Sequence, residues 1–340
     1  QPATDVVIDI TSGDTGEATV APPSLTFTTA NWFTPQTVTV TGVDDDLIDG
    51  SQSTTLTLSV NDAASDDAYD AVPDQTQSVT TTDDDVAGFT VTESGGATVV
   101  NESGTTDDIT VVLDAEPTSN VEIDVSSADT GEASVGPATL VFTPATWDTP
   151  QTVTVTGEND LDIDGSQTTV VTFTVDDANS DDAFDPVADQ TVSVTTTDDD
   201  APGISVTETG GDTQVDESGT TDTFTVVLSS GPATDVVLTV SSGDTGEATV
   251  SPATLTFTSV DWATPQTVTV TGVQDALPDG DQVSIVTIAV DDAASDDAYD
   301  PVPNQTVSVT TTDDDGAGVT RSEERRHGDG WRDVRHGGRW

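Results

Sequence analysis

The stretch "QTVTVTG" occurs three times in the sequence, at residues 36–42, 151–157 and 266–272. In an extended chain Val38 and Val40 lie on one face and the threonines between them on the other, a period of two that is typical of a half-buried β-strand. β-Branched residues on both faces favour a pleated sheet. The stretch therefore predicts a β-strand in each copy, and the chain lacks the 3.6-residue period and caps that indicate helices.

The copies of this stretch are 115 residues apart, and the same offset relates other features of the chain. These features include Trp32, Trp147 and Trp262 and the motif "DTGEA" at residues 14–18, 129–133 and 244–248. A unit of this length is a whole domain, unlike the short motif of a solenoid. The predicted domains are a truncated repeat at 1–85 that lacks its opening strands, and complete repeats at 86–200 and 201–315.

Each complete repeat is expected to hold seven or eight short strands, separated by turns rich in Gly, Pro, Asp and Ser. About seven alternating strands in roughly 100 residues are typical of an antiparallel β-sandwich. The predicted fold class is therefore all-β, a tandem array of immunoglobulin-like antiparallel β-sandwiches.

The charge of the chain is distributed unevenly. It has 64 acidic residues, six Arg and no Lys, and every Arg and both His lie after Asp315. No side-chain salt bridge can therefore form within residues 1–315, and this region would repel nucleic acid and anionic membranes. Without His or Cys it also cannot form a Ser-His-Asp triad, a His and Cys zinc site or a reactive thiol. Carboxylate oxygens remain, and they suit hard cations such as Ca²⁺.

Each repeat closes with the run "SVTTTDDD", which begins at Ser78, Ser193 and Ser308. Two like charges about 4 Å apart repel by on the order of 1 kcal/mol in water, and by more when partly buried. In an extended chain the outer aspartates of a triplet point to one side and the middle one to the other. With no Lys or Arg before Arg321, a cation from solution is the expected partner of these triplets.

Several elements in a fixed order resemble a known family. They are an acidic residue after an opening strand ("VVNESG", "VDESG"), a polar turn ("SSADTGEA"), a strand pair from "LTFT" through the Trp to "TPQTVTVTG", an acidic loop ("VDDDLIDG") and the closing "DDD". Together they are similar to the Calx-β domains and the related immunoglobulin-like repeats of large bacterial surface proteins. The resemblance covers about residues 1–320.

This resemblance implies that Ca²⁺ is bound at one end of each sandwich by loop carboxylates. In the second repeat the implied ligands are Glu102, Asp129, Asp160, Asp164, Asp198, Asp199 and Asp200. In the third repeat they are Glu217, Asp244, Asp275, Asp279, Asp313, Asp314 and Asp315. In the first repeat they are Asp14, Asp44, Asp45, Asp46, Asp49, Asp83, Asp84 and Asp85. A further acidic loop, "DDAASDDAYD" or "DDANSDDAFD", has no place in this scheme.

Other interpretations of these residues remain. The acidic surface is also compatible with a solvated or salt-adapted face that holds no specific metal. The Trp of each repeat is expected to anchor the rim of the core, with a stacking platform for sugars as the alternative. Paired carboxylates such as Asp181 and Asp182 occur in glycoside hydrolases, but the same acids recur in every repeat without a pocket-forming insertion, so no enzyme is expected.

The predicted function is a non-catalytic, Ca²⁺-rigidified stalk of an adhesin or extracellular matrix fibre, on the cell surface or secreted, with a secretion signal upstream. Its expected partners are calcium ions and other copies in a fibre; the alternative is an array of modules that bind surface carbohydrate or protein. Residues 316–340 form an atypical basic tail after this acidic array. A shifted reading frame can turn the tail into "SGGTVTDGGTSDTVVV", similar to Ser94–Val112, so we interpret it as the displaced start of a further repeat.

Overall fold

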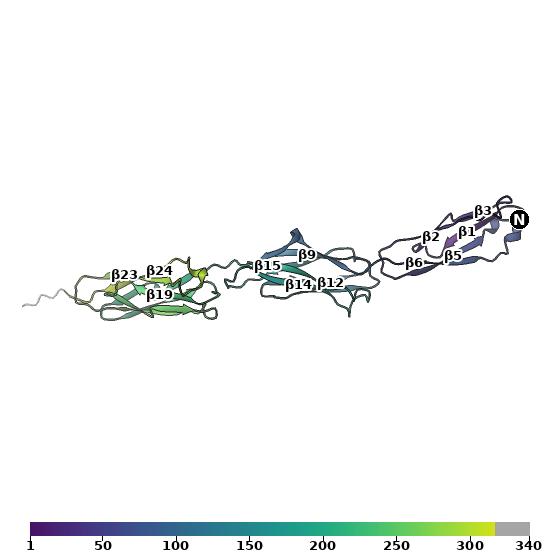
Figure 1. The fold of residues 1–340 in the computed structure, drawn as a ribbon. Helices are drawn as coiled ribbons and strands as arrows, with labels where there is room; N and C mark the ends of the chain where they lie inside the picture. Colours follow the sequence, from purple (N-terminus) through teal and green to yellow (C-terminus); the bar gives the residue numbers. More distant parts are fainter. Residues whose placement is uncertain (317–340) are drawn as a thin grey trace, which may run out of the picture. The chain divides into compact units, whose positions relative to one another are not determined.

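The computed structural model describes residues 1–316 and is an all-β protein (Figure 1). It comprises two compact units. Unit 1 holds Gln1–Asp160 and Asp164–Asp199, and unit 2 holds Leu161–Ile163 and the described residues from Asp200 onward. The tail from residue 317, with its proposed frame displacement, lies outside the described residues. Among those described, no helix is long and apolar enough to cross a bilayer.

Unit 2 contains one complete β-sandwich. Its strands are β16 (Ile204–Glu208), β17 (Thr213–Asp216), β18 (Thr221–Leu228), β19 (Val236–Ser242), β20 (Ala248–Ser251), β21 (Thr254–Phe257), β22 (Gln266–Gly272), β23 (Gln282–Val290) and β24 (Gln305–Thr312). One sheet has the order β16-β18-β22-β20 and the other β17-β24-β23-β19-β21. The core between them joins Phe224 and Val268 of the first sheet to Phe257 and Ile288 of the second.

Residues 86–199 of unit 1 form the same sandwich. The strands are β7 (Phe89–Glu93), β8 (Thr98–Asn101), β9 (Thr106–Leu113), β10 (Val121–Ser127), β11 (Ala133–Gly136), β12 (Thr139–Phe142), β13 (Gln151–Gly157), β14 (Gln167–Val175) and β15 (Gln190–Thr197). Their sheet orders, β11-β13-β9-β7 and β12-β10-β14-β15-β8, match those of unit 2. The sequence repeat is therefore a structural repeat.

Residues 1–85 hold a smaller set of strands. They are β1 (Val6–Ser12), β2 (Ala18–Ala21), β3 (Ser24–Phe27), β4 (Thr39–Gly42), β5 (Gln52–Val60) and β6 (Gln75–Thr81), in the sheets β3-β1-β5-β6 and β2-β4. The first "QTVTVTG" copy forms only the four-residue β4, whereas β13 and β22 have seven residues each. β13 and β22 each pair with a strand from the start of their repeat, and β4 pairs with β2 alone.

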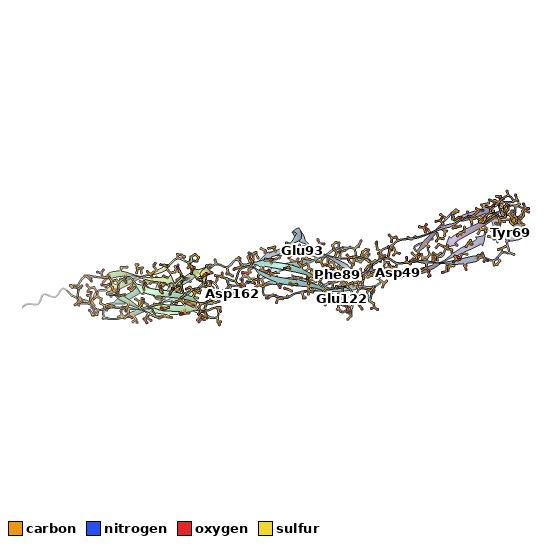
Figure 2. All side chains as sticks on the ribbon, in the orientation of Figure 1. Asp49, Tyr69, Phe89, Glu93, Glu122 and Asp162 are labelled. Atoms are coloured by element: carbon orange, nitrogen blue, oxygen red, sulfur yellow. The ribbon has the colours of Figure 1, made fainter. Side chains whose placement is uncertain are left out.

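The alternation predicted for "QTVTVTG" is confirmed in the complete repeats. Val268 and Val270 of β22 are fully buried, while Thr269 and Thr271 are half-buried and Thr267 is exposed. Side chains project from both faces of the sheets (Figure 2). Trp147 and Trp262 are partly buried and pack against the two cores, which supports their role as anchors.

One strand of each complete repeat departs from the antiparallel expectation. β17 pairs in parallel with β24, from Thr213 opposite Val309 to Asp216 opposite Thr312, and β8 pairs in the same way with β15. The alternation that predicted seven or eight strands does not identify this strand among the nine of each complete repeat, because four residues with two buried positions are too short to show a period. Only the resemblance indicated a strand before the acidic residue of "VVNESG" and "VDESG". These strands matter because each leads directly into a buried glutamate.

The acidic loop that the sequence could not place is structural. In unit 2 the carboxylate of Asp296 accepts hydrogen bonds from the amides of Thr234 (2.8 Å) and Ala298 (3.0 Å). Burial acts to raise the pKa of Asp296, but these hydrogen bonds hold it below its ordinary value. The ring of Tyr299 is fully buried, and its hydroxyl donates to the carbonyl of Ser230 (2.5 Å). Asp181 has the equivalent role in unit 1, where the amide of Ser119 donates to it (2.8 Å).

Candidate metal centres

The closing triplet of the third repeat lies beside a buried glutamate. Glu217 follows β17, and its amide donates to the carbonyl of Thr312 (3.2 Å), so the parallel strand pair brings Glu217 next to the triplet. Gly272, the last residue of "QTVTVTG", permits this approach, because a Cβ there would lie 2.2 Å from the carbonyl oxygen of Asp216. Glu217, Asp313 and Asp315 each offer a carboxylate oxygen, all within 4.8 Å of one another.

The glutamate at the centre of this group has no internal partner. Glu217 is 1% exposed, and neither carboxylate oxygen accepts a hydrogen bond. Burial, followed by the charges of Asp313 and Asp275, raises its pKa to about 7. A buried carboxylate without a partner is costly. A divalent cation would reverse the repulsion and supply that partner.

Asp313, the first residue of the triplet, connects the group to the neighbouring loop. Its carboxylate accepts a hydrogen bond from the amide of Gly280 (2.8 Å) and another from the amide of Asp315 (2.7 Å). Gly280 has a φ of 76°, a conformation that favours glycine. Asp83 and Asp198 accept the equivalent bond from the glycine of their own loops. The triplet and the acidic loop are thus held together in all three repeats.

A second acidic group lies close to the first in unit 2. Glu247, Asp275 and Asp279 bring carboxylate oxygens within 4.8 Å of one another. Burial, then the charges of Asp279 and Asp244, raises the pKa of Glu247, and its Oε2 has no hydrogen-bond partner. The charge of Asp313 also contributes to this shift, which places both groups at the same end of the sandwich.

Unit 1 has related carboxylates. Glu102 is 1% exposed and has a carboxylate oxygen within 4.8 Å of one from Asp199. Burial and then the charges of Asp198 and Asp160 raise its pKa to about 7. Burial, followed by Asp164 and Asp160, also raises the pKa of Glu132. Asp200, the next residue after Asp199, belongs to unit 2, where the hydroxyl of Ser230 donates to it (3.3 Å).

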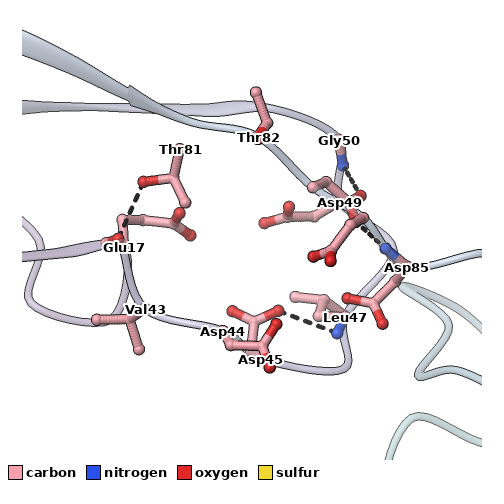
Figure 3. A pocket seen from close by; sticks show the side chains of 12 residues that line it. Glu17, Val43, Asp44, Asp45, Leu47, Asp49, Gly50, Thr81, Thr82 and Asp85 are labelled. Atoms are coloured by element: carbon pink, nitrogen blue, oxygen red, sulfur yellow. Dashed lines mark hydrogen bonds between the residues drawn. The ribbon is translucent and has the colours of Figure 1, made fainter. Parts of the chain in front are cut away.

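The first repeat gathers its carboxylates around a hollow. The acidic residues that line it are Glu17, Asp44, Asp45, Asp49, Asp83, Asp84 and Asp85. Figure 3 shows the carboxylates of Glu17 and Asp49 directed into it. Burial and the charges of Asp49 and Asp45 raise the pKa of Glu17. Residues 1–85 hold no counterpart of Glu102, because they lack the segment that would contain it.

Not every residue implied by the resemblance joins a group. Asp14, Asp129 and Asp244 are exposed and use their side chains in the "DTGEA" turns, where each accepts a hydrogen bond from the glycine amide two residues later (2.9 Å). The glutamate of the same motif lies in or beside the acidic groups instead: Glu17, Glu132 and Glu247. Sequence reasoning missed these glutamates. Their recurrence in all three motifs was the available signal.

The middle aspartates of the triplets, Asp84, Asp199 and Asp314, are exposed, and their neighbours on both sides are half-buried. This alternation is the one expected for an extended chain. Asp46 is exposed, and its carbonyl accepts a hydrogen bond from the amide of Glu116 (2.7 Å).

The donor set fits one kind of ligand. Ca²⁺ takes six to eight oxygen ligands, and carboxylates, carbonyls and water supply them. Among residues 1–316 there is no Lys, Arg, His or Cys, so these groups offer neither a phosphate clamp nor a zinc site with soft ligands. The buried, unpartnered oxygens of Glu217 are where a hard cation fits best.

Comparison with known proteins adds little to this geometry. No protein-family model matches the sequence, and a search of curated proteins found no match. A solved structure of CBD12 from CALX1.2 is 13% identical over 65% of this chain and 98% of its own, with a TM-score of 0.28. Domains 4–9 of the surface layer protein SbsC are 16% identical over 90% of this chain and 39% of their own, also with a TM-score of 0.28. SSP-19 of Caenorhabditis elegans, an MSP-domain protein, is 17% identical over 32% of this chain and 97% of its own, at 0.23. Likenesses this weak carry no argument about function.

Proposed function

We propose that the chain is a non-catalytic structural segment whose β-sandwich repeats bind Ca²⁺ at the end that holds the acidic groups. The observation that carries this proposal is Glu217, a buried carboxylate with two unpartnered oxygens beside Asp313 and Asp315. Glu102 is equally buried in unit 1, and its pKa is also raised to about 7. A solvated acidic surface would not need to bury a carboxylate at the same position of both complete repeats.

The expected role of calcium is to lock each repeat. The groups join the first residues after a short parallel strand to the closing triplet and the acidic loop, three segments far apart in sequence. Without a cation their mutual repulsion loosens this end, and a bound divalent ion reverses that effect. A repeat stiffened in this way suits a stalk of an adhesin or a fibre of an extracellular matrix, and millimolar calcium outside cells fills even weak sites. This proposal places the protein on the cell surface or outside the cell.

Calorimetric titration of the whole chain with Ca²⁺ tests the proposal. We expect binding that Glu217→Gln and Glu102→Gln each weaken at least about tenfold at one site, because each change removes a buried anionic ligand. Glu122→Gln is the matched control, since it removes a half-buried carboxylate from the face of β10 that is turned away from the core. A titration with no heat, and an unchanged melting temperature in calcium and in chelator, would contradict calcium binding. Glycan binding that is lost in Trp147→Ala would instead support a carbohydrate-binding array.

A further inference from the structure

The loop that follows the first "QTVTVTG" strand has an apolar tip, Leu47 and Ile48, and in unit 1 this tip is bound. The amide of Ile48 donates to the carbonyl of Glu116 (3.0 Å), and the amide of Glu116 donates to the carbonyl of Asp46 (2.7 Å). Leu47 forms an isolated parallel bridge with Glu116, and Ile48 packs against the core of residues 86–199. The loop of the first repeat therefore binds the opening region of the next repeat, and we call a loop that does so a strap.

Unit 2 contains the same contact 115 residues later. The amide of Ile163 donates to the carbonyl of Gly231 (2.8 Å), and the amide of Gly231 donates to the carbonyl of Leu161 (2.5 Å). Asp162 takes the place of Leu47 in the isolated bridge, and Ile163 packs against the core of unit 2. Two hydrogen bonds and one half-buried isoleucine thus recur at the same positions.

The third loop has the same local conformation. The amide of Leu277 donates to the carboxylate of Asp275 (2.7 Å), and the amide of Asp279 donates to the carbonyl of Leu277 (2.8 Å). In the first loop Leu47 makes the equivalent bonds, at 3.0 Å to Asp45 and 2.9 Å from Asp49. Leu277 is nevertheless 62% exposed, whereas Leu47 is half-buried. The tip is shaped for a contact that residues 1–316 do not provide.

We propose that the tip at Leu277 is a docking surface for the opening region of a further repeat of the same type. The tip should pair with a residue at the position of Glu116, as Leu47 does. The structure also explains why the opposing residue can vary. A Cβ on Gly231 would lie 2.0 Å from the carboxylate of Asp162, so a larger residue there would displace that side chain, whereas Leu47 lies opposite a glutamate.

Pro278 changes the strength of this docking. It occupies the position of Ile48 and Ile163, whose amides each donate one of the two hydrogen bonds. Proline has no amide hydrogen, so only the bond that the Ala276 carbonyl accepts can form. The third strap is therefore expected to hold its partner less firmly than the other two.

The test extends the chain by placing a second copy of Val86–Asp200, which supplies Glu116, directly after Asp315. Because the protein has no cysteine, Leu277→Cys introduces a unique thiol. Docking should slow its labelling at least about tenfold relative to Leu277→Cys in the unextended whole chain, since labelling then requires the strap to open. Val260→Cys, at a side chain that is 92% exposed, should react equally in both chains.

Hydrogen exchange of the added Glu116 amide, with Pro278 and with Pro278→Ile, provides two further measurements. In the extended chain without a cysteine, the added Glu116 amide should be protected from hydrogen exchange, but less than the original, because Pro278 removes one of the two hydrogen bonds of the contact. Pro278→Ile restores the missing donor and should slow this exchange further. Equal labelling of Leu277→Cys in the two chains, or a fast-exchanging added Glu116 amide, would overturn the proposal. Protection in the unextended chain that grows with protein concentration would also overturn it, and would identify a second copy as the occupant.

Discussion

The most decisive prediction concerns the protons that calcium displaces. A carboxylate must be ionised to bind a metal, and the pKa of Glu217 is raised to about 7 by burial and by Asp313 and Asp275. About half of these carboxyls hold a proton at pH 7, about nine-tenths at pH 6 and about one-tenth at pH 8. Filling the site should therefore release about 0.9 protons from Glu217 at pH 6, about 0.5 at pH 7 and about 0.1 at pH 8.

The perturbation is Glu217→Gln, and the measured quantity is the difference in proton release between this variant and the unaltered chain. Calorimetric titrations in two buffers of different ionisation enthalpy give the number of protons that the chain releases when it binds calcium. Taking the difference removes the contribution of other carboxyls with raised pKa values, such as Glu102 and Glu247. Glu122→Gln is expected to release as many protons as the unaltered chain.

The expected difference falls by about 0.8 protons between pH 6 and pH 8. A difference below about 0.1 at pH 6, or one that does not fall with rising pH, would refute the link between the burial of Glu217 and cation binding.

Three other outcomes are expected. In chelator the free energy of unfolding should fall as pH rises from about 4.5 to about 7. The folded-state pKa values of Glu217 and Glu102 are raised to about 7, above their ordinary 4.5. The folded state therefore binds more protons than the unfolded state in this window. Urea unfolding at several pH values checks this, and saturating calcium should abolish the fall. Calcium at about 100 times its Kd should add about 2.7 kcal/mol per independent site to the free energy of unfolding, seen as a rise in Tm. Asp296→Ala should cost about 1–3 kcal/mol, because it leaves the amides of Thr234 and Ala298 without their acceptor, while the exposed Asp297→Ala should change urea unfolding little.

Much of the fold was predictable from local pattern. The alternation of "QTVTVTG" places Val268 and Val270 in the core, and the 115-residue period correctly implied that the complete repeats share one sheet order. β17 was not predictable in this way, because its four residues gain their structure from pairing with β24. The parallel direction of that pair likewise depends on the route of the chain around the sandwich, which no local pattern records.

The candidate site was predictable in part. Glu217, Asp313 and Asp315 were all implied ligands, and the structure brings them together. The motif "DTGEA" contains two acids, and only the fold determines that Asp244 closes its own turn while Glu247 enters the second group. The loop around Asp296 remained unexplained because its role is to accept amide hydrogens from a segment about 60 residues away.

The short parallel strand also sets the order in which a repeat can mature. β17 lies near the start of its repeat and β24 at its end, with Asp216 opposite Thr312. A chain that emerges from a ribosome or a secretion channel N-terminus first exposes Glu217 long before Asp313 and Asp315. The group of Glu217, Asp313 and Asp315 can therefore assemble only after the last residues of the repeat have emerged. Each repeat would stay loosely folded while it is being threaded, and would be locked one at a time from the N-terminal end.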